Sequence, residues 1–183
     1  MKKTFKWFGI VLAGLVALLV LVGLFLPSTY AVERSLTMHA PAALIFAQVD
    51  DLKKNRAWSP WHAADKTLQV TYGERTVGVG ASSHWHGESS GKGRMKVTKS
   101  VPARRIEIHL DFEEGQADSF WRFDAKGKHK TEVTWGMAGD SGWNLMGRYF
   151  GLCMDRMVGP YYEDGLRRLK KVSERLAKQE PTP

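Results

Sequence analysis

The chain has 183 residues, of which 43% are hydrophobic and 11% aromatic, and a formal net charge of +8. These fractions are ample for one packed domain, and they exclude an intrinsically disordered protein. The basic residues near the C-terminus alternate with Glu and Asp and come with no recognition motif, so we expect no nucleic-acid partner.

The first predicted element is an apolar segment near the N-terminus. No residue from Trp7 to Leu26 is charged, and a helix of about 20 residues spans the hydrocarbon core of a bilayer. Lys2, Lys3 and Lys6 precede it without an acidic residue, which places the N-terminus in the cytoplasm. We therefore expect residues 1–27 to form a cytoplasmic stub and an uncleaved single-pass anchor in the inner (cytoplasmic) membrane, with the domain facing the periplasm or the cell exterior. A cleaved signal peptide is the alternative, because a weak small-residue cleavage site follows the span.

Residues 28–178 are predicted to form one domain, followed by a disordered tail at 179–183. Partial alternation indicates a strand over Tyr30–Met38, and a helix follows with Pro41 in its first turn and apolar residues at helical spacing. The segment Trp58–Trp61 then places two indoles around a proline. Because proline lacks an N–H and disfavours helix in the residue before it, this segment predicts a bend.

The middle of the chain has the two-residue period of strands that are buried on one face. Four runs show it: Leu68, Val70 and Tyr72; Ala81, Ser83 and Trp85; Ile106, Ile108, Leu110 and Phe112; Val133, Trp135 and Met137. Connectors of hairpin length, rich in glycine, proline or charge, lie between the runs. This arrangement predicts an antiparallel meander of about six strands after the first helix.

The last segment has the period of a helix lying on a sheet. Apolar residues recur every three or four positions over residues 143–176. Pro160 interrupts this pattern, and proline inside a helix costs about 3 kcal/mol and bends it. We therefore expect a shorter leading helix, a kink near Gly159 and a long helix to about Lys178.

Several segments together carry a family resemblance. They are "LPSTYAVERSLTMHAPAALIFAQVDDLKKNRAWSPW", "GVGASSHWHG", "GKGRMKV", "VPARRIEIHLDF", "TEVTWGM" and "GLCMD…GPYYEDGLRRLKKVSE". They resemble the membrane-anchored, polyketide cyclase/dehydratase-like branch of the SRPBCC superfamily over roughly Ser28–Leu176. The resemblance implies an α+β helix-grip fold, in which a curved antiparallel sheet of about seven strands wraps a long C-terminal helix around a hydrophobic cavity, as in START lipid-transfer domains.

The implied cavity lies between sheet and helix, and the two periodicities predict which side chains line it. Trp58 and Trp61 are expected at its mouth or rim, with core packing as the alternative role, and His62 is the candidate polar group there. The expected ligand-binding residues are Trp58, Trp61, His62, Trp85, Trp121, Trp135, Met137, Met146, Phe150, Met154 and Met157. A pocket of Met and Trp suits an apolar, loosely specified ligand, and a filled core is the alternative.

One pair of histidines is a candidate for chemistry. His84 and His86 are two residues apart, so they share one face of the predicted strand and could bind a metal or act as acid and base. Trp85 lies on the other face, with the apolar residues, so both histidines are predicted to point away from the cavity. No third ligand stands at suitable spacing. We therefore expect no catalytic residue, no metal and no cofactor.

These observations lead to three functional hypotheses. The preferred one is a membrane-tethered domain that binds a hydrophobic small molecule or lipid, without catalysis. The alternatives are a polyketide cyclase/dehydratase-like enzyme, which needs a convergent acid–base pair, and an envelope interaction scaffold with a filled core. Cys153 is the only cysteine, so the chain forms no internal disulfide, and its oligomeric state stays open.

Overall fold

A single antiparallel sheet of seven strands organises the domain in the computed structural model, which describes residues 2–113 and 115–179. The strands lie in the order β1-β7-β6-β5-β4-β3-β2, so the first strand pairs with the last and the others form a meander. Their bounds are β1 Thr29–Met38, β2 Gln69–Tyr72, β3 Ser82–Gly87, β4 Gly91–Val101, β5 Arg105–Phe112, β6 Gly115–Ala125 and β7 Thr131–Asp140. The predicted sheet of about seven strands is confirmed.

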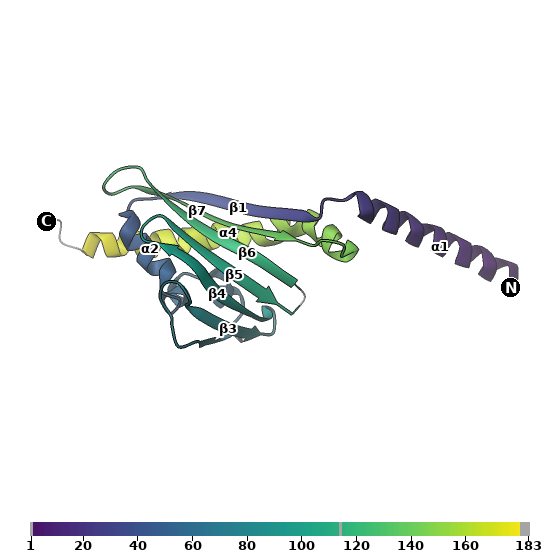
Figure 1. Ribbon diagram of the computed structural model, residues 1–183, viewed down its shortest axis with the longest axis horizontal. Coiled ribbons are helices and arrows are strands. Elements are labelled where there is room, and N and C mark those ends of the chain that lie inside the picture. The colour runs from purple at the N-terminus through teal and green to yellow at the C-terminus, as the bar shows by residue number, and fades with distance from the viewer. Residues whose placement is uncertain (1, 114, 180–183) are drawn as a thin grey trace.

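Four α-helices and one 3-10 helix accompany the sheet in the described residues. They are α1 Lys2–Phe25, α2 Ala42–Asp50, the 3-10 helix η1 Lys54–Ala57, α3 Pro60–Ala64 and α4 Leu145–Gln179. Helix α4 runs along the sheet and packs mainly on β1, whereas α1 extends away from the domain at the end where α4 begins (Figure 1). This is the predicted helix-grip arrangement, with an additional apolar helix at the N-terminus.

Helix α4 corrects one prediction. It is a single helix of 35 residues that continues through Pro160, so the expected division into two helices is wrong. The clash that usually keeps the residue before proline out of a helix involves that residue's Cβ, and Gly159 has none. The helix ends at Gln179, one residue beyond the predicted end, so the predicted tail at 179–183 begins inside it. The other four tail residues lie outside the described part of the chain.

The buried core lies between the sheet, α2, the short helices and the later half of α4. The buried residues of α4 occupy one face between Gly159 and Ser173, and they include Tyr162, Leu166 and Leu169. Full burial of each large apolar side chain contributes about 1.5–3 kcal/mol. The half of α4 that precedes Gly159 has no buried residue.

A glycine brings α4 close to the bend between η1 and β2. A Cβ on Gly165 would lie 2.7 Å from Trp135 Cζ3 and 3.0 Å from Pro60 Cδ, closer than side chains tolerate. The helix therefore reaches both the β7 tryptophan and the first residue of α3 only because this position has no side chain. Pro60 occupies the first turn of α3, where its missing N–H leaves no hydrogen bond unmade.

Helix α1 is the one helix in the described residues that is long and apolar enough to cross a membrane. Its apolar part covers Trp7–Phe25, and nearly all of this part is exposed. A membrane span and a signal sequence both fit a helix of this kind at this place in the chain.

Candidate functional site

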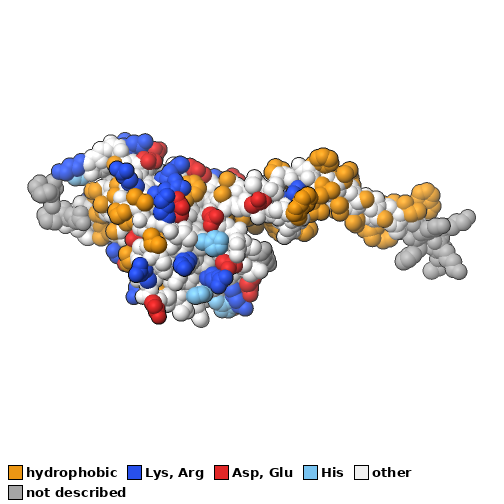
Figure 2. All heavy atoms as spheres, in the orientation of Figure 1, with side chains coloured by type: hydrophobic (Ala, Val, Ile, Leu, Met, Phe, Trp, Pro, Cys, Tyr) orange, Lys and Arg blue, Asp and Glu red, His pale blue; other side chains and the backbone are white. Residues whose placement is uncertain are grey.

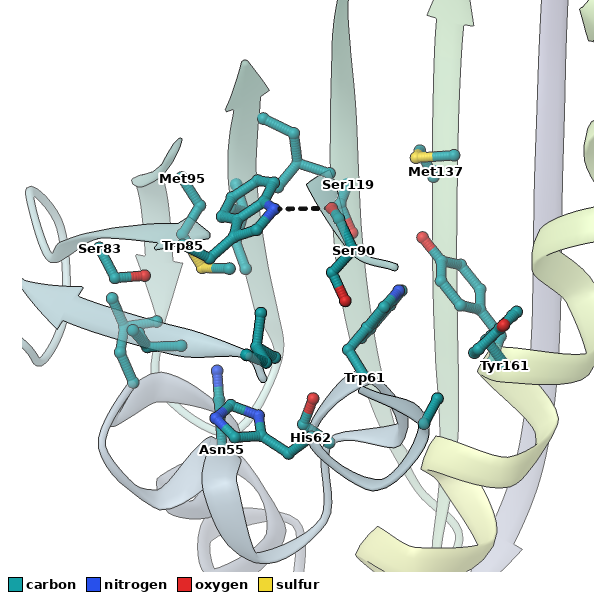
Figure 3. A pocket seen from close by; sticks show the side chains of 18 of the residues that line it. Asn55, Trp61, His62, Ser83, Trp85, Ser90, Met95, Ser119, Met137 and Tyr161 are labelled. Atoms are coloured by element: carbon teal, nitrogen blue, oxygen red, sulfur yellow. Dashed lines mark hydrogen bonds between the residues drawn. The ribbon is translucent and has the colours of Figure 1, made fainter. Parts of the chain in front are cut away.

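A cavity of about 390 Å³ lies between the sheet and the helices η1, α3 and α4 (Figure 3). Side chains from strands β2 to β7 form one wall, and the helices form the other. Ligand pockets in proteins measure about 300–1,000 Å³, so this cavity is near the small end of the range. The structure therefore has an internal space between sheet and helix and not a completely filled core.

Stacked aromatic rings form the inner wall. The rings of Trp121 and Trp135 are parallel with centroids 4.3 Å apart, and Trp135 and Tyr162 are parallel at 4.0 Å. Trp58 meets Trp121 and Trp135 edge to face, at 5.4 and 5.9 Å. Such arrangements stabilise aromatic pairs beyond their buried area. These four side chains pack against one another and form one aromatic wall.

The two indoles of the bend have different roles. Trp58 is 3% exposed and donates its Nε1–H to the carbonyl of Gln48 at 3.0 Å, so it belongs to the core and not to the rim. Trp61 is half-buried, lies edge to face with Trp135 and is parallel to Tyr161 at 6.2 Å between centroids. The bend around Pro60 thus places one tryptophan in the core and the other where the cavity opens.

Another part of the sheet wall is built around Trp85 on β3. Its Nε1–H donates to the carbonyl of Ser90 at 3.3 Å, and its ring meets Phe112 edge to face (Figure 3). The indole lies over Gly93 on the neighbouring strand, where a Cβ would collide with it. His84 and His86 are exposed, so they occupy the face of β3 that is turned away from the cavity, as the alternation predicts.

Two polar atoms of the cavity lining have no partner. Among the described residues, Asn55 Oδ1 and His62 Nδ1 are buried without a hydrogen bond, and both residues line the cavity. Burial lowers the pKa of the His62 imidazole, and the nearby Arg56 lowers it further. His62 is therefore neutral at pH 7. Since buried polar groups are almost always hydrogen-bonded, this pair is suited to the polar end of a ligand or to water.

Asp65 fastens the bend to the β3–β4 turn. Its carboxylate is buried and accepts hydrogen bonds from the Thr67 hydroxyl at 2.6 Å and backbone N–H at 2.9 Å. It also accepts from the backbone N–H groups of Ser89 at 3.1 Å and Ser90 at 2.9 Å. These bonds, the Thr67 hydroxyl foremost, lower the pKa of Asp65 well below its ordinary value of 3.8. The carboxylate thus holds two segments of the cavity wall together.

Replacing Asp65 by Asn is expected to lower the melting temperature at neutral pH, because an amide cannot accept all of these bonds. A carboxyl with a lowered folded-state pKa stabilises the fold above its unfolded value of 3.8, and this contribution is lost as pH falls through the folded value. The difference between wild type and variant should therefore shrink below pH 3.8 in thermal unfolding followed by circular dichroism. Asp124→Asn, at an exposed position, is the control. Equal melting temperatures of wild type and Asp65→Asn at neutral pH would contradict this role.

The structure brings together most of the predicted ligand-binding residues. Those that line the cavity are Trp58, Trp61, His62, Trp85, Trp121, Trp135, Met137 and Met157. Met146, Phe150 and Met154 do not line it. Met146 and Phe150 are 66% and 56% exposed, and Met154 packs at the edge of the core. The prediction assumed that the whole helix lies on the sheet, whereas only its later half is buried there. Ligand contact by any of these residues stays a prediction.

Other lining residues were not predicted as site residues. Tyr161 belongs to the helical stripe and Leu110 to a strand alternation, so both patterns contained a signal for the cavity. Ser119 on β6 donates its hydroxyl hydrogen to the carbonyl of Gly136 and accepts from Trp135 Nε1. No periodicity identifies Ser119 or Asp65, whose roles depend on hydrogen bonds between distant segments, or Asn55, whose buried Oδ1 has no partner.

In residues 2–113 and 115–179, no group of three or more His, Cys, Asp and Glu side chains is placed to hold a metal ion. The cavity lining contains one histidine and one carboxylate, His62 and Asp65, and the carboxylate is already occupied by the four donors described above.

Residues 29–174 match the model of a protein family described as polyketide cyclase / dehydrase and lipid transport. No curated protein matches the chain in sequence. The matched region contains the whole sheet and most of α4.

Solved structures with the same fold include a Thermobifida fusca protein determined by solution NMR, with a TM-score of 0.60 and 16% identity, covering 80% of this chain and 94% of that one. The Zhui aromatase/cyclase from a Streptomyces species gives a TM-score of 0.58 at 16% identity, with the same coverage of 80% and 94%. A Chromobacterium violaceum protein gives 0.52 at 15% identity, covering 80% and 97%. At these identities the likeness shows the fold alone.

Proposed function

The chain belongs to the polyketide cyclase / dehydrase and lipid transport family, and from this premise we propose that its domain binds a hydrophobic small molecule in the cavity between sheet and helix. The observation that carries the proposal is the cavity lining. Five of the seven tryptophans of the chain line it, together with methionine, leucine, isoleucine and valine side chains. Apolar and aromatic walls with few polar groups are typical of small-molecule sites.

The size and polarity of the cavity limit the class of ligand. A volume of about 390 Å³ suits one apolar chain or a small fused-ring system better than a two-chain phospholipid. The unpartnered Asn55 Oδ1 and His62 Nδ1 offer hydrogen bonds to a hydroxyl or carboxyl group at one end of such a molecule. We infer a single-chain or ring-shaped amphiphile, with its polar end near these two residues.

The N-terminal helix supports a membrane location for this binding domain. The apolar part of α1, Trp7–Phe25, is exposed in the structure, and only a bilayer or another apolar surface would cover it. Lys2, Lys3 and Lys6 favour a cytoplasmic N-terminus, and hence a domain outside the inner membrane. We propose that α1 tethers the domain next to the bilayer from which an apolar ligand comes.

Tryptophan fluorescence tests the binding proposal directly. In a Trp7→Phe/Trp143→Phe background, the five remaining tryptophans all line the cavity. Dibrominated stearic acid, whose bromines quench nearby indoles, should quench this protein saturably when cyclodextrin delivers it to the full chain in vesicles. Unbrominated stearic acid should reverse the effect by competition. Quenching that never saturates, or none at all, would contradict the proposal for single-chain amphiphiles.

A cyclase or dehydratase activity is the second candidate, and the unpartnered polar pair favours it. His62 is neutral and so is a possible base, but catalysis also needs an acid within reach. Two other titratable groups of the cavity are less suitable, because burial raises the pKa of Tyr162 and hydrogen bonds lower that of Asp65. Binding without chemistry therefore fits the cavity better. Conversion of a bound molecule into a product of different mass would support the enzyme instead.

A further inference from the structure

The first half of α4 carries an exposed apolar face. Its members are Met146, Phe150, Cys153, Met157 and Tyr161, each three or four residues from the next, and we call them the entry face. Met146 and Phe150 are 66% and 56% exposed, and Met157 and Tyr161 are 53% and 42% exposed. With a rise of 1.5 Å per residue, the entry face extends over about 22 Å of helix. A continuous apolar surface of this kind on a domain indicates an interaction site.

One end of the entry face is fixed beside α1. Arg148 Nη1 donates to the carbonyls of Leu24 at 2.9 Å and Leu26 at 3.2 Å, and the Tyr149 hydroxyl donates to the carbonyl of Leu19 at 2.6 Å. The last carbonyls of a helix have no partners of their own, and α1 has no basic residue in its last turn. Arg148 therefore caps the C-terminal end of α1 and holds the start of α4 against it.

Figure 2 shows the apolar surface that α1 shares with the adjoining end of the domain. Hydrophobic side chains cover α1 along its described length and continue onto the adjoining end of the domain, where α4 begins. If α1 spans a bilayer, the capped end of α1 lies at the membrane boundary. Met146 and Phe150 then emerge directly from that boundary.

The other end of the entry face is part of the cavity. Met157 and Tyr161 both line the cavity while remaining about half exposed, so they belong to its mouth. Tyr161 is parallel to Trp61, which forms the facing part of the rim (Figure 3). The apolar surface is thus continuous from the end of α1 to the cavity mouth.

We propose that the entry face is the path along which the apolar chain of a membrane-derived ligand moves between the bilayer and the cavity. This inference rests on the proposed function, because it requires both a ligand in the cavity and a bilayer around α1. Exposing apolar surface to water costs about 25 cal/mol per Å². An apolar ligand chain that lies on the entry face has one side covered by protein between the membrane and the cavity mouth. This contact lowers the free-energy barrier to transfer.

The test compares two faces of the same helix. Met146→Glu/Phe150→Glu places charges on the entry face, while Leu152→Glu is the matched control. Leu152 is equally apolar and 61% exposed, but it stands about 140° around the helix from Met157, which lies five residues further on. All proteins carry the Trp7→Phe/Trp143→Phe background and are reconstituted as full chains. Stopped-flow fluorescence then records quenching by dibrominated stearic acid supplied from the same vesicles or from cyclodextrin.

The double glutamate variant should take up the probe from vesicles about tenfold more slowly, a factor that corresponds to about 1.4 kcal/mol of lost contact along the path. Its final quenching from cyclodextrin should equal that of wild type, and Leu152→Glu should resemble wild type in both assays. Vesicle uptake as fast as wild type would overturn the entry path. Absence of quenching in every protein, even from cyclodextrin, would instead overturn the proposed function.

Two further measurements keep the test decisive. If the glutamate variant has a lower melting temperature, Met146→Ser/Phe150→Ser removes two large apolar side chains of the entry face without adding charge, and the same slowing is expected. Mass photometry of each reconstituted protein reports its oligomeric state. A dimer that only the entry-face variants dissociate would show that a second copy covers this face, which would overturn the proposal.

Discussion

Replacing Leu110 by tryptophan is expected to reduce the affinity for stearic acid by at least about tenfold, which corresponds to about 1.4 kcal/mol. Leu110 is half-buried on β5 and lines the cavity, so a larger ring there occupies space that a ligand needs. Overpacking usually costs about 1–3 kcal/mol, but here the added atoms enter an existing cavity and the loss of stability should be small. Calorimetric titration of the full chain in lipid nanodiscs measures the affinity.

The control for this change is Val79→Trp, which adds a similar volume at a position that is 50% exposed and outside the cavity lining. This variant should bind stearic acid as wild type does. Wild-type affinity in Leu110→Trp, with its melting temperature unchanged, would show that the ligand does not occupy this cavity.

Replacing Trp135 by alanine is expected to lower the free energy of unfolding by about 3–5 kcal/mol, the usual cost of removing a large aromatic side chain from a core. Trp135 is 5% exposed, lies between Trp121 and Tyr162 in the stack, and donates its Nε1–H to Ser119. Its loss leaves a void that these neighbours cannot fill without breaking the stack. Urea unfolding followed by circular dichroism measures the effect.

Trp143→Ala provides the matched comparison, because Trp143 is 84% exposed. Surface substitutions usually change stability by less than about 0.5 kcal/mol, and we expect this variant to fall in that range. A Trp135→Ala protein with stability close to that of Trp143→Ala would mean that the aromatic stack does not support the cavity wall.

Sequence periodicity predicted the sheet side of the cavity well, because alternation in a strand decides which side chains share a face. Trp85 follows Ala81 and Ser83 in that alternation, and its indole does point into the cavity. The same reasoning placed His84 and His86 on the outer face, where the structure has them exposed. Each of these inferences depends on neighbours within a few residues, which sequence reasoning can use.

Periodicity was insufficient for α4. An apolar stripe shows which face of a helix is hydrophobic, but it does not show how much of the helix a sheet covers. Met146 and Phe150 belong to the same stripe as Gly165 and Leu169, yet the first pair is exposed and the second is buried. Pro160 does not divide the helix, and the glycine before it removes one of the steric conflicts that proline usually introduces.

The polar side of the cavity was beyond sequence reasoning for a different reason. Asp65 is held by donors from residues up to 25 positions away, and Asn55 lies in a 3-10 helix that no pattern indicated. Only His62 was predicted there, from its place beside the bend. Hydrogen bonds between distant segments, and the empty volume itself, arise from the folded arrangement and leave no periodic trace in the sequence.

Native mass spectrometry of the full chain, released gently from membranes, is the most direct test of the proposed binding function. We expect the wild-type protein to carry one apolar molecule of defined mass, either from the cell or after incubation with stearic acid. The Leu110→Trp variant should carry none, and Val79→Trp should resemble wild type. A wild-type protein that shows only its own mass in both preparations would contradict the account.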